Sequence, residues 1–235
     1  MATTRNKGGI PRRAAAGRAS RNTARGPGRP MGSESFDGRE ALLASAHQVM
    51  LESHGMPPSM NYICERAGIN PAMVRYHFGN KHELMIALFE SISSTWGPPL
   101  QELMALDVSA LKKLEIHVRQ IVRNYRAYPY VSRLMTELQL NSNAKTQKRL
   151  SSSFVDQLLQ FYRHAIDEGV RTGLMRPIEP LFLLLSIVGL CEYLFSAQLM
   201  LEAGIGLKVT DELEARFVQH TTALILDGVR ARPGK

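Results

Sequence analysis

The sequence predicts an all-α protein, and three observations lead to that fold class. Apolar residues recur every three or four positions along most of the chain after residue 36, which is the period of an amphipathic helix. Residues that commonly cap helices, such as Ser59 and Asn70, stand directly before several of these stretches. The sequence shows no strict alternation of apolar and polar residues, which would mark a half-buried strand. With 235 residues, 44% of them hydrophobic, the chain is long enough to bury a sizeable core.

The charge of the chain is concentrated at its N-terminus. The formal net charge is +8, and residues 1–33 hold eight arginines and lysines with no acidic residue, so the remainder is neutral. Residues 1–36 are also rich in Gly, Pro, Arg and Ser and are predicted to form a disordered basic arm. Basic arms commonly bind nucleic acid, and we expect the same here. A solvating tail without a specific role and a targeting segment are the alternatives.

A short motif in the arm indicates the kind of nucleic acid. The run Arg25-Gly26-Pro27-Gly28-Arg29-Pro30 is similar to the core of an AT-hook, in which an arginine enters the narrow minor groove of A·T-rich DNA. We therefore predict that Arg25 and Arg29 contact DNA.

Residues 37–95 are predicted to form a domain of four helices. Their apolar spacing and flanking residues place them at Arg39–Ser53, Met60–Arg66, Pro71–Phe78 and Lys81–Thr95. The residues expected to cap their N-termini are Asp37, Ser59, Asn70 and Asn80. The turns between them are expected at Gly55–Pro58, Ala67-Gly68 and Gly79. Two short helices around an Ala-Gly turn, preceded by a longer helix, describe a helix-turn-helix unit.

This unit resembles a known family. The resemblance lies in Ile63-Cys64-Glu65-Arg66-Ala67-Gly68-Ile69-Asn70, in Tyr76-His77-Phe78, and in Lys81 with Glu83-Leu84. In this order and spacing they resemble the DNA-binding signature of the TetR family of bacterial repressors, over about residues 39–90. The sequence departs from the family pattern at Cys64, Asn70 and Arg75, where Ala, Ser and an aromatic residue are usual. These departures leave the apolar packing positions intact and concern which bases are preferred.

The resemblance implies a palindromic double-stranded DNA operator, with the helix over Pro71–Phe78 in the major groove. In the family, the positions of Tyr76, His77 and Lys81 chiefly hold phosphates. The positions of Pro71, Ala72 and Arg75 approach base edges. The predicted DNA-binding residues of the helices are Ser59, Asn70, Pro71, Ala72, Met73, Arg75, Tyr76, His77 and Lys81.

The helical period separates the two faces of this recognition helix. Because residues four apart share a face, Val74 and Phe78 point inward. Arg75 then faces the groove and can donate two hydrogen bonds, for which guanine O6 and N7 are the natural partners. A contact between Arg75 and a phosphate is the alternative.

Residues 96–232 are predicted to form a second, entirely helical domain. A short helix begins at Pro98-Pro99, and longer ones cover Val108–Tyr128 and Pro129–Leu140, followed by a polar link at Asn141–Lys145. The next helix ends at Gly173 and carries an apolar stripe of Phe154, Leu158, Phe161 and Ala165.

Two further helices complete this domain. The segment Pro180–Ala203 is nearly uniformly apolar, which predicts burial on most sides. Thr210 with Asp211 caps the last helix. One side of that helix is expected to hold Leu213, Phe217, Leu224 and Gly228.

This second domain carries a more particular resemblance. The region of Trp96, the run Tyr128–Leu134 and Ile178-Glu179-Pro180 are similar to the pyrimidine-responsive repressors within the TetR family. The resemblance implies that the helical body binds a small-molecule effector and forms a homodimer through the two C-terminal helices. The large apolar surface of those helices independently favours a dimer.

The candidate effector-binding residues are Trp96, Tyr125, Tyr128 and Glu192, with Tyr130 as a further aromatic. The aromatic residues either line a pocket or belong to the core. Glu192 lies on an apolar helix face, where a carboxylate needs a partner. That partner is either the ligand or an internal cation, with Arg119, Arg126 and Arg163 as candidates. Glu192 stands where the subgroup places an amide that meets the base, and a carboxylate lacks amide donors, which disfavours uracil as the effector.

Other classes of function find less support. Cys64 and Cys191 cannot form a disulfide framework and no Cys/His spacing resembles a zinc site, so we expect a reducing, cytoplasmic location without metal or cofactor. A metal site of His117, His164 and Glu192 is the alternative. The longest apolar run, Leu181–Cys191, is too short to span a membrane.

We therefore expect a dimeric repressor that a small molecule releases from its operator. Effector binding in the body would favour a different spacing of the two DNA-binding units. An architectural protein bound to nucleic acid through its arm is one alternative. The other is an enzyme on a helical scaffold, although no paired carboxylates, nucleophile elbow or phosphate loop appear.

Overall fold

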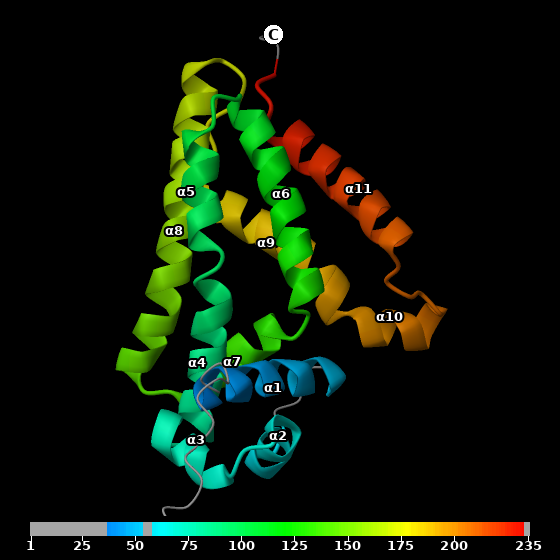
Figure 1. Cartoon of the computed structure of the whole chain (residues 1–235). Coiled ribbons are helices and arrows are strands. Elements are labelled where there is room, and N and C mark those ends of the chain that lie inside the picture. The colour runs from blue at the N-terminus through cyan, green and yellow to red at the C-terminus, as the bar shows by residue number, and fades with distance from the viewer. Residues whose placement is uncertain (1–36, 54–57, 233–235) are drawn as a thin grey trace, which may run out of the picture. The chain divides into compact units, whose positions relative to one another are not determined.

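The computed structural model describes residues 37–53 and 58–232, and these residues fold into helices (Figure 1). In chain order they are α1 (Gly38–Glu52), α2 (Met60–Ala67), α3 (Pro71–Phe78), α4 (Lys81–Ser93), α5 (Gly97–Ala105), α6 (Ala110–Ala127), α7 (Val131–Asn141), α8 (Ala144–Arg171), α9 (Pro180–Ser196), α10 (Gln198–Ile205) and α11 (Asp211–Val229). The β-structure in this part of the chain consists of one isolated antiparallel bridge, between Met175 and Arg230. The predicted all-α class is confirmed. The arm, with Arg25 and Arg29, and the predicted turn at Gly55 lie outside the described residues.

Three of the first four helices begin at the predicted residue, and α1 begins one residue earlier than predicted, at Gly38. The side-chain oxygens of Asp37, Ser59, Asn70 and Asn80 each accept a hydrogen bond from a backbone N–H in the first turn that follows. Gly68, between α2 and α3, has φ +65°, a left-handed conformation that residues with a Cβ rarely adopt. The helix-turn-helix geometry is therefore encoded locally, by caps and by one glycine.

Buried side chains form two clusters. The first joins α1, α2, α3 and α4 and is completed by Tyr130, by the α7 residues Val131, Leu134 and Leu138, and by Leu150. The second lies among α5, α6, α8, α9 and α11 and includes Phe161 and Tyr162. Tyr125, near the end of α6, packs against both clusters. The helix that follows α6 thus belongs to the core of the DNA-binding unit.

The prediction for residues 180–203 was wrong in two respects. The segment forms two helices, α9 and α10, which meet at a 54° bend near Ala197. It is also not buried on most sides, because five large side chains of α9 are exposed in the single chain: Leu181, Phe182, Leu185, Leu190 and Tyr193. Phe182 alone is 63% exposed. In the described residues no single helix is long and apolar enough to cross a membrane; α9 and α10 reach that length and composition only as a bent pair.

Three smaller expectations also need correction. The helix predicted from Val108 begins at Ala110, because Ser109 takes the cap position and accepts from the Lys112 N–H. The polar link is shorter than Asn141–Lys145, since Asn143 caps α8. The face predicted for α11 is divided, since Leu213 and Phe217 pack against the core whereas Leu224 and Gly228 are exposed.

Candidate functional site

The recognition helix α3 has one buried and one exposed face. Val74 is completely buried, and Phe78 is partly buried with the Arg39 guanidinium 5.4 Å from its ring centroid. The opposite face leaves five of the predicted DNA-binding residues exposed: Pro71, Ala72, Met73, Arg75 and Tyr76. Tyr76 is 80% exposed, which is unusual for an aromatic side chain. The inward direction predicted for Val74 and Phe78 is confirmed.

The other predicted DNA-binding residues border this face. Ser59 and Asn70 are the exposed caps of α2 and α3, and Lys81 is half-buried at the start of α4. His77 is half-buried beneath α1, because a Cβ on Gly38 would lie 3.2 Å from its Nε2 atom. That Nε2 atom is buried without a hydrogen-bond partner in the described structure. These side chains and the exposed face of α3 form one surface, and its contact with DNA stays a prediction.

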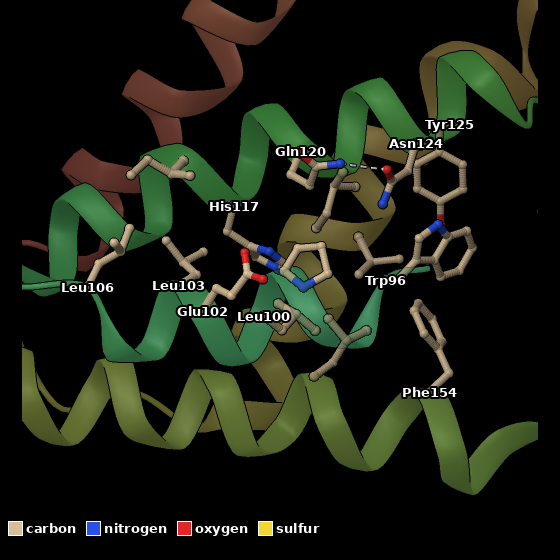
Figure 2. A pocket seen from close by; sticks show the side chains of 15 residues that line it. Trp96, Leu100, Glu102, Leu103, Leu106, His117, Gln120, Asn124, Tyr125 and Phe154 are labelled. Atoms are coloured by element: carbon tan, nitrogen blue, oxygen red, sulfur yellow. Dashed lines mark hydrogen bonds between the residues drawn. The ribbon is translucent and has the colours of Figure 1, made fainter. Parts of the chain in front are cut away.

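A cavity of about 260 Å³ lies among α5, α6, α8 and α9, as Figure 2 shows from close by. Most of its lining is apolar, and Trp96, Tyr125 and Phe154 supply aromatic walls. The rings of Trp96 and Phe154 contact each other, with centroids 4.9 Å apart. The structure thus brings two of the predicted effector-binding residues, Trp96 and Tyr125, to one cavity.

Polar groups in this cavity come mainly from one face of α6. They are His117, Gln120 and Asn124, to which α5 adds Glu102. The Gln120 Nε2 donates to Asn124 Oδ1 at 2.9 Å. Gln120 and Asn124 were not among the predicted effector residues, although Gln120 follows His117 by three positions and Asn124 follows Gln120 by four, a spacing that places all three on one helix face.

His117 and Tyr125 are neutral in this environment. His117 is fully enclosed, its Nε2 lies 2.9 Å from the Tyr162 hydroxyl oxygen, and burial lowers its pKa to about 3. Burial is the main cause that raises the pKa of Tyr125 to about 12. The charge of nearby Glu192 also raises this pKa, whereas a hydrogen bond with Ser132 lowers it. The acidic residue of the lining is Glu102, which is exposed.

Tyr128 and Glu192, the other two predicted effector residues, do not line the cavity. Tyr128 lies beyond the end of α6 and contacts the ring of His47 in α1, with centroids 5.3 Å apart. His47 Nδ1 also lies 2.6 Å from the Tyr130 hydroxyl oxygen. The chain segment after α6 is thus attached directly to the first helix of the DNA-binding unit.

The internal ion pair considered for Glu192 is not present in the described structure. Two of the candidate cations bind other carboxylates: Arg119 contacts Glu115 at 3.2 Å, and Arg126 contacts Glu214 at 2.8 Å and also Asp211. No ion pair involves Glu192 or Arg163 within residues 37–53 and 58–232. Over the same residues no group of three or more His, Cys, Asp or Glu side chains could hold a metal ion.

Comparison with known families identifies the helical body. The family described as "Tetracyclin repressor-like, C-terminal domain" matches residues 107–235, which is more than half of the chain. The chain belongs to the TetR family. Its predicted membership is therefore confirmed, and this TetR-family protein is a DNA-binding transcription regulator by family. A search of curated proteins found no significant match.

Solved structures of other regulators share the fold of this TetR-family protein. The fatty acid degradation regulator FadR of Bacillus halodurans aligns with TM-score 0.64 and 20% identity, covering 85% of this chain and 100% of its own. A TetR/AcrR-family regulator of Thermobifida fusca aligns with TM-score 0.63 and 16% identity, covering 81% and 97%. FadR of Bacillus subtilis, in complex with stearoyl-CoA, aligns with TM-score 0.61 and 16% identity, covering 80% and 98%.

Proposed function

We propose that this TetR-family protein is a homodimeric repressor that a small-molecule effector releases from a palindromic operator. The observation that carries the proposal is the course of α6. This helix lines the cavity with Gln120 and Asn124, and the segment that follows it reaches His47 of α1 through Tyr128 and Tyr130. A ligand that shifts α6 therefore acts on the helix against which His77 of α3 is packed.

A ligand site in the helical body has support from one neighbour of known structure. FadR of Bacillus subtilis was solved with stearoyl-CoA, so a body of this fold holds a ligand in that protein. The resemblance to the pyrimidine-responsive subgroup, at Trp96 and Tyr128–Leu134, stays a prediction. We retain Trp96 and Tyr125 as effector contacts because both line the cavity. In this proposal Glu192 acts through Tyr125, whose pKa its charge raises, and Tyr128 acts through its contact with His47.

The exposed apolar face of α9 supports the proposed homodimer. Phe182, Leu185 and Tyr193 would otherwise remain in water, and α11 adds the exposed Leu224. Contiguous apolar surface of this kind marks protein–protein contacts. We propose that a second copy of the chain covers it. The functional division into an arm over 1–36, a DNA-binding domain over 37–95 and an effector domain over 96–232 belongs to the same proposal.

Footprinting on the promoter region of the protein's own gene tests this function. We expect a protected palindrome with half-sites about one DNA turn apart. Protection should disappear when a metabolite extract that contains the effector is added. Uniform coverage of the DNA would instead support the architectural protein, in which the basic arm supplies the binding and the body only dimerises. Absence of DNA binding would contradict both the repressor and the architectural protein, and an enzyme on a helical scaffold would be the remaining hypothesis.

Replacing Arg75 with alanine should weaken operator binding by about 1–3 kcal/mol and relax the preference for guanine at one position per half-site. Arg75 lies on the exposed face of α3 and can donate two parallel hydrogen bonds to a guanine edge. The measurement is a binding-site selection with the parent and the variant. Lys81→Ala is the control, because loss of a phosphate contact should weaken binding to all sequences alike. If Arg75→Ala keeps the parent's guanine preference, Arg75 does not read a base.

A further inference from the structure

The cavity presents hydrogen-bond donors that have no acceptor within it. Trp96 lines the cavity, and its indole Nε1 atom is buried without a hydrogen-bond partner in the described structure. A buried donor without a partner costs about 1–3 kcal/mol, so the site favours a ligand that supplies the acceptor.

The second donor is the side-chain amide of Asn124, whose orientation is fixed by its neighbours. The Arg123 guanidinium only donates, and its Nη2 donates to Gln120 Oε1 at 3.1 Å. Gln120 therefore turns its amide nitrogen to Asn124 Oδ1. The NH₂ group of Asn124 remains available, and in Figure 2 it points away from Gln120 into the space between α5 and α6.

The residues that line the cavity include no cation to pair with an anionic ligand. Among the described residues no lysine or arginine lines it, His117 is neutral at neutral pH, and the acidic residue of the lining is Glu102. A carboxylate or phosphate moved from water into this apolar space would lose its hydration without gaining a cation. The donors therefore serve an uncharged acceptor.

The size and walls of the cavity restrict the ligand further. Its volume of about 260 Å³ is below the ~300–1,000 Å³ typical of sites for drug-sized molecules. Trp96 and Phe154 offer ring faces in tilted contact, and Tyr125 adds a third aromatic wall. Aromatic walls of this kind pack well against a planar ring.

We propose that the effector is a small, uncharged, ring-containing molecule whose carbonyl-type oxygen accepts hydrogen bonds from Trp96 and Asn124. Fatty acids and acyl-CoA thioesters carry a charged group for which this lining offers no cation. This inference rests on the proposed function, because it assigns the chemical class of the molecule that the same cavity binds.

The single tryptophan of the chain makes the test direct. Trp96 is the only tryptophan, so its fluorescence reports the cavity in the full-length protein. Benzamide and benzoate have the same shape, but benzoate is charged. We expect saturable quenching or a spectral shift with benzamide, binding of benzoate at least about tenfold weaker, and no saturable change with stearoyl-CoA. Equal or tighter binding of benzoate, a saturable response to stearoyl-CoA, or no saturable response to benzamide would overturn the proposal.

A matched pair of variants tests the role of Asn124. Asn124→Asp keeps an oxygen that accepts from Gln120 but removes the NH₂ donor and adds negative charge. Benzamide affinity should fall about tenfold, the scale of one lost hydrogen bond. Asn141→Asp makes the same chemical change at an exposed residue of α7 and should leave benzamide affinity unchanged. Equal benzamide affinity in both variants would overturn the assignment of Asn124. If Asn124→Asp does not fold, the comparison of benzamide with benzoate in the parent protein still decides the ligand class.

These titrations contain no DNA, so they separate the ligand class from the proposed function. Benzamide binding with the expected preference supports the ligand class whether or not DNA is released. A metabolite that abolishes the footprint, together with a cavity that prefers benzoate, supports the function and overturns the ligand class.

Discussion

Replacing Lys113 with methionine should lower the free energy of unfolding by about 3 kcal/mol, the scale on which breaking a buried ion pair destabilises a protein. The Lys113 side chain is only 5% exposed. Its Nζ donates to Glu168 Oε2 at 2.7 Å and to the Met104 carbonyl oxygen at 3.0 Å. The substitution leaves a carboxylate and a carbonyl, both partly removed from water, without this donor. Urea denaturation at one fixed protein concentration measures the change.

The adjacent lysine provides a control with nearly the same chemistry. Lys112 contacts Glu115 at 3.0 Å, but its side chain is 51% exposed. Because exposed ion pairs contribute little, Lys112→Met should change stability by less than about 1 kcal/mol. The double variant Lys113→Met with Glu168→Leu should recover most of the loss, since no unpaired charge then remains. Similar effects at Lys112 and Lys113 would show that burial does not govern the interaction.

Lowering the pH from 7 to 5 should destabilise the parent protein relative to His117→Gln by about 2 kcal/mol. Burial holds the pKa of His117 at about 3 in the folded protein, whereas an unfolded histidine has its usual pKa near 6.5. Between these values only the unfolded state binds the proton. The stability associated with neutral His117 is therefore complete above pH 6.5 and declines by about 1.4 kcal/mol per pH unit as the pH falls toward 3.

Denaturation curves at several pH values, for parent and variant, measure this difference. Glutamine cannot titrate but can still hydrogen-bond the Tyr162 hydroxyl, so all other ionisable groups cancel in the comparison. Parallel stability curves for the parent and His117→Gln would mean that His117 is protonated as readily in the folded protein as in the unfolded chain.

The features predicted correctly from the sequence are those set by nearby residues. Asp37, Ser59, Asn70 and Asn80 cap helices through backbone groups two or three positions away, so a short stretch of sequence is sufficient to identify them. The same holds for the inward face of α3, which the helical period determines through Val74 and Phe78.

The features that sequence reasoning missed depend on distant partners. Lys113 is buried because Glu168, 55 residues away, pairs with it, and a lysine alone is expected at the surface. The bend near Ala197 has no proline or glycine to signal it. Tyr128 does not line the cavity because it follows the last helical residue of α6 and has a non-helical backbone conformation, with φ −131° and ψ 62°. Its side chain then meets His47, which no spacing along α6 predicts.

The shared core has a consequence for exchanging parts between regulators. Tyr130, Leu134 and Leu138 are buried together with the helix-turn-helix unit, although they follow α6 in the chain. A fragment cut after residue 95 would lose this cover and expose the apolar side chains of α1 and α4. A chimera that joins α1 to α4 of this protein to a foreign body would need a matching α7 as well. The DNA sequence specificity can therefore be transferred to another regulator by substituting residues on the exposed surface of α3, but not by moving α1 to α4 alone.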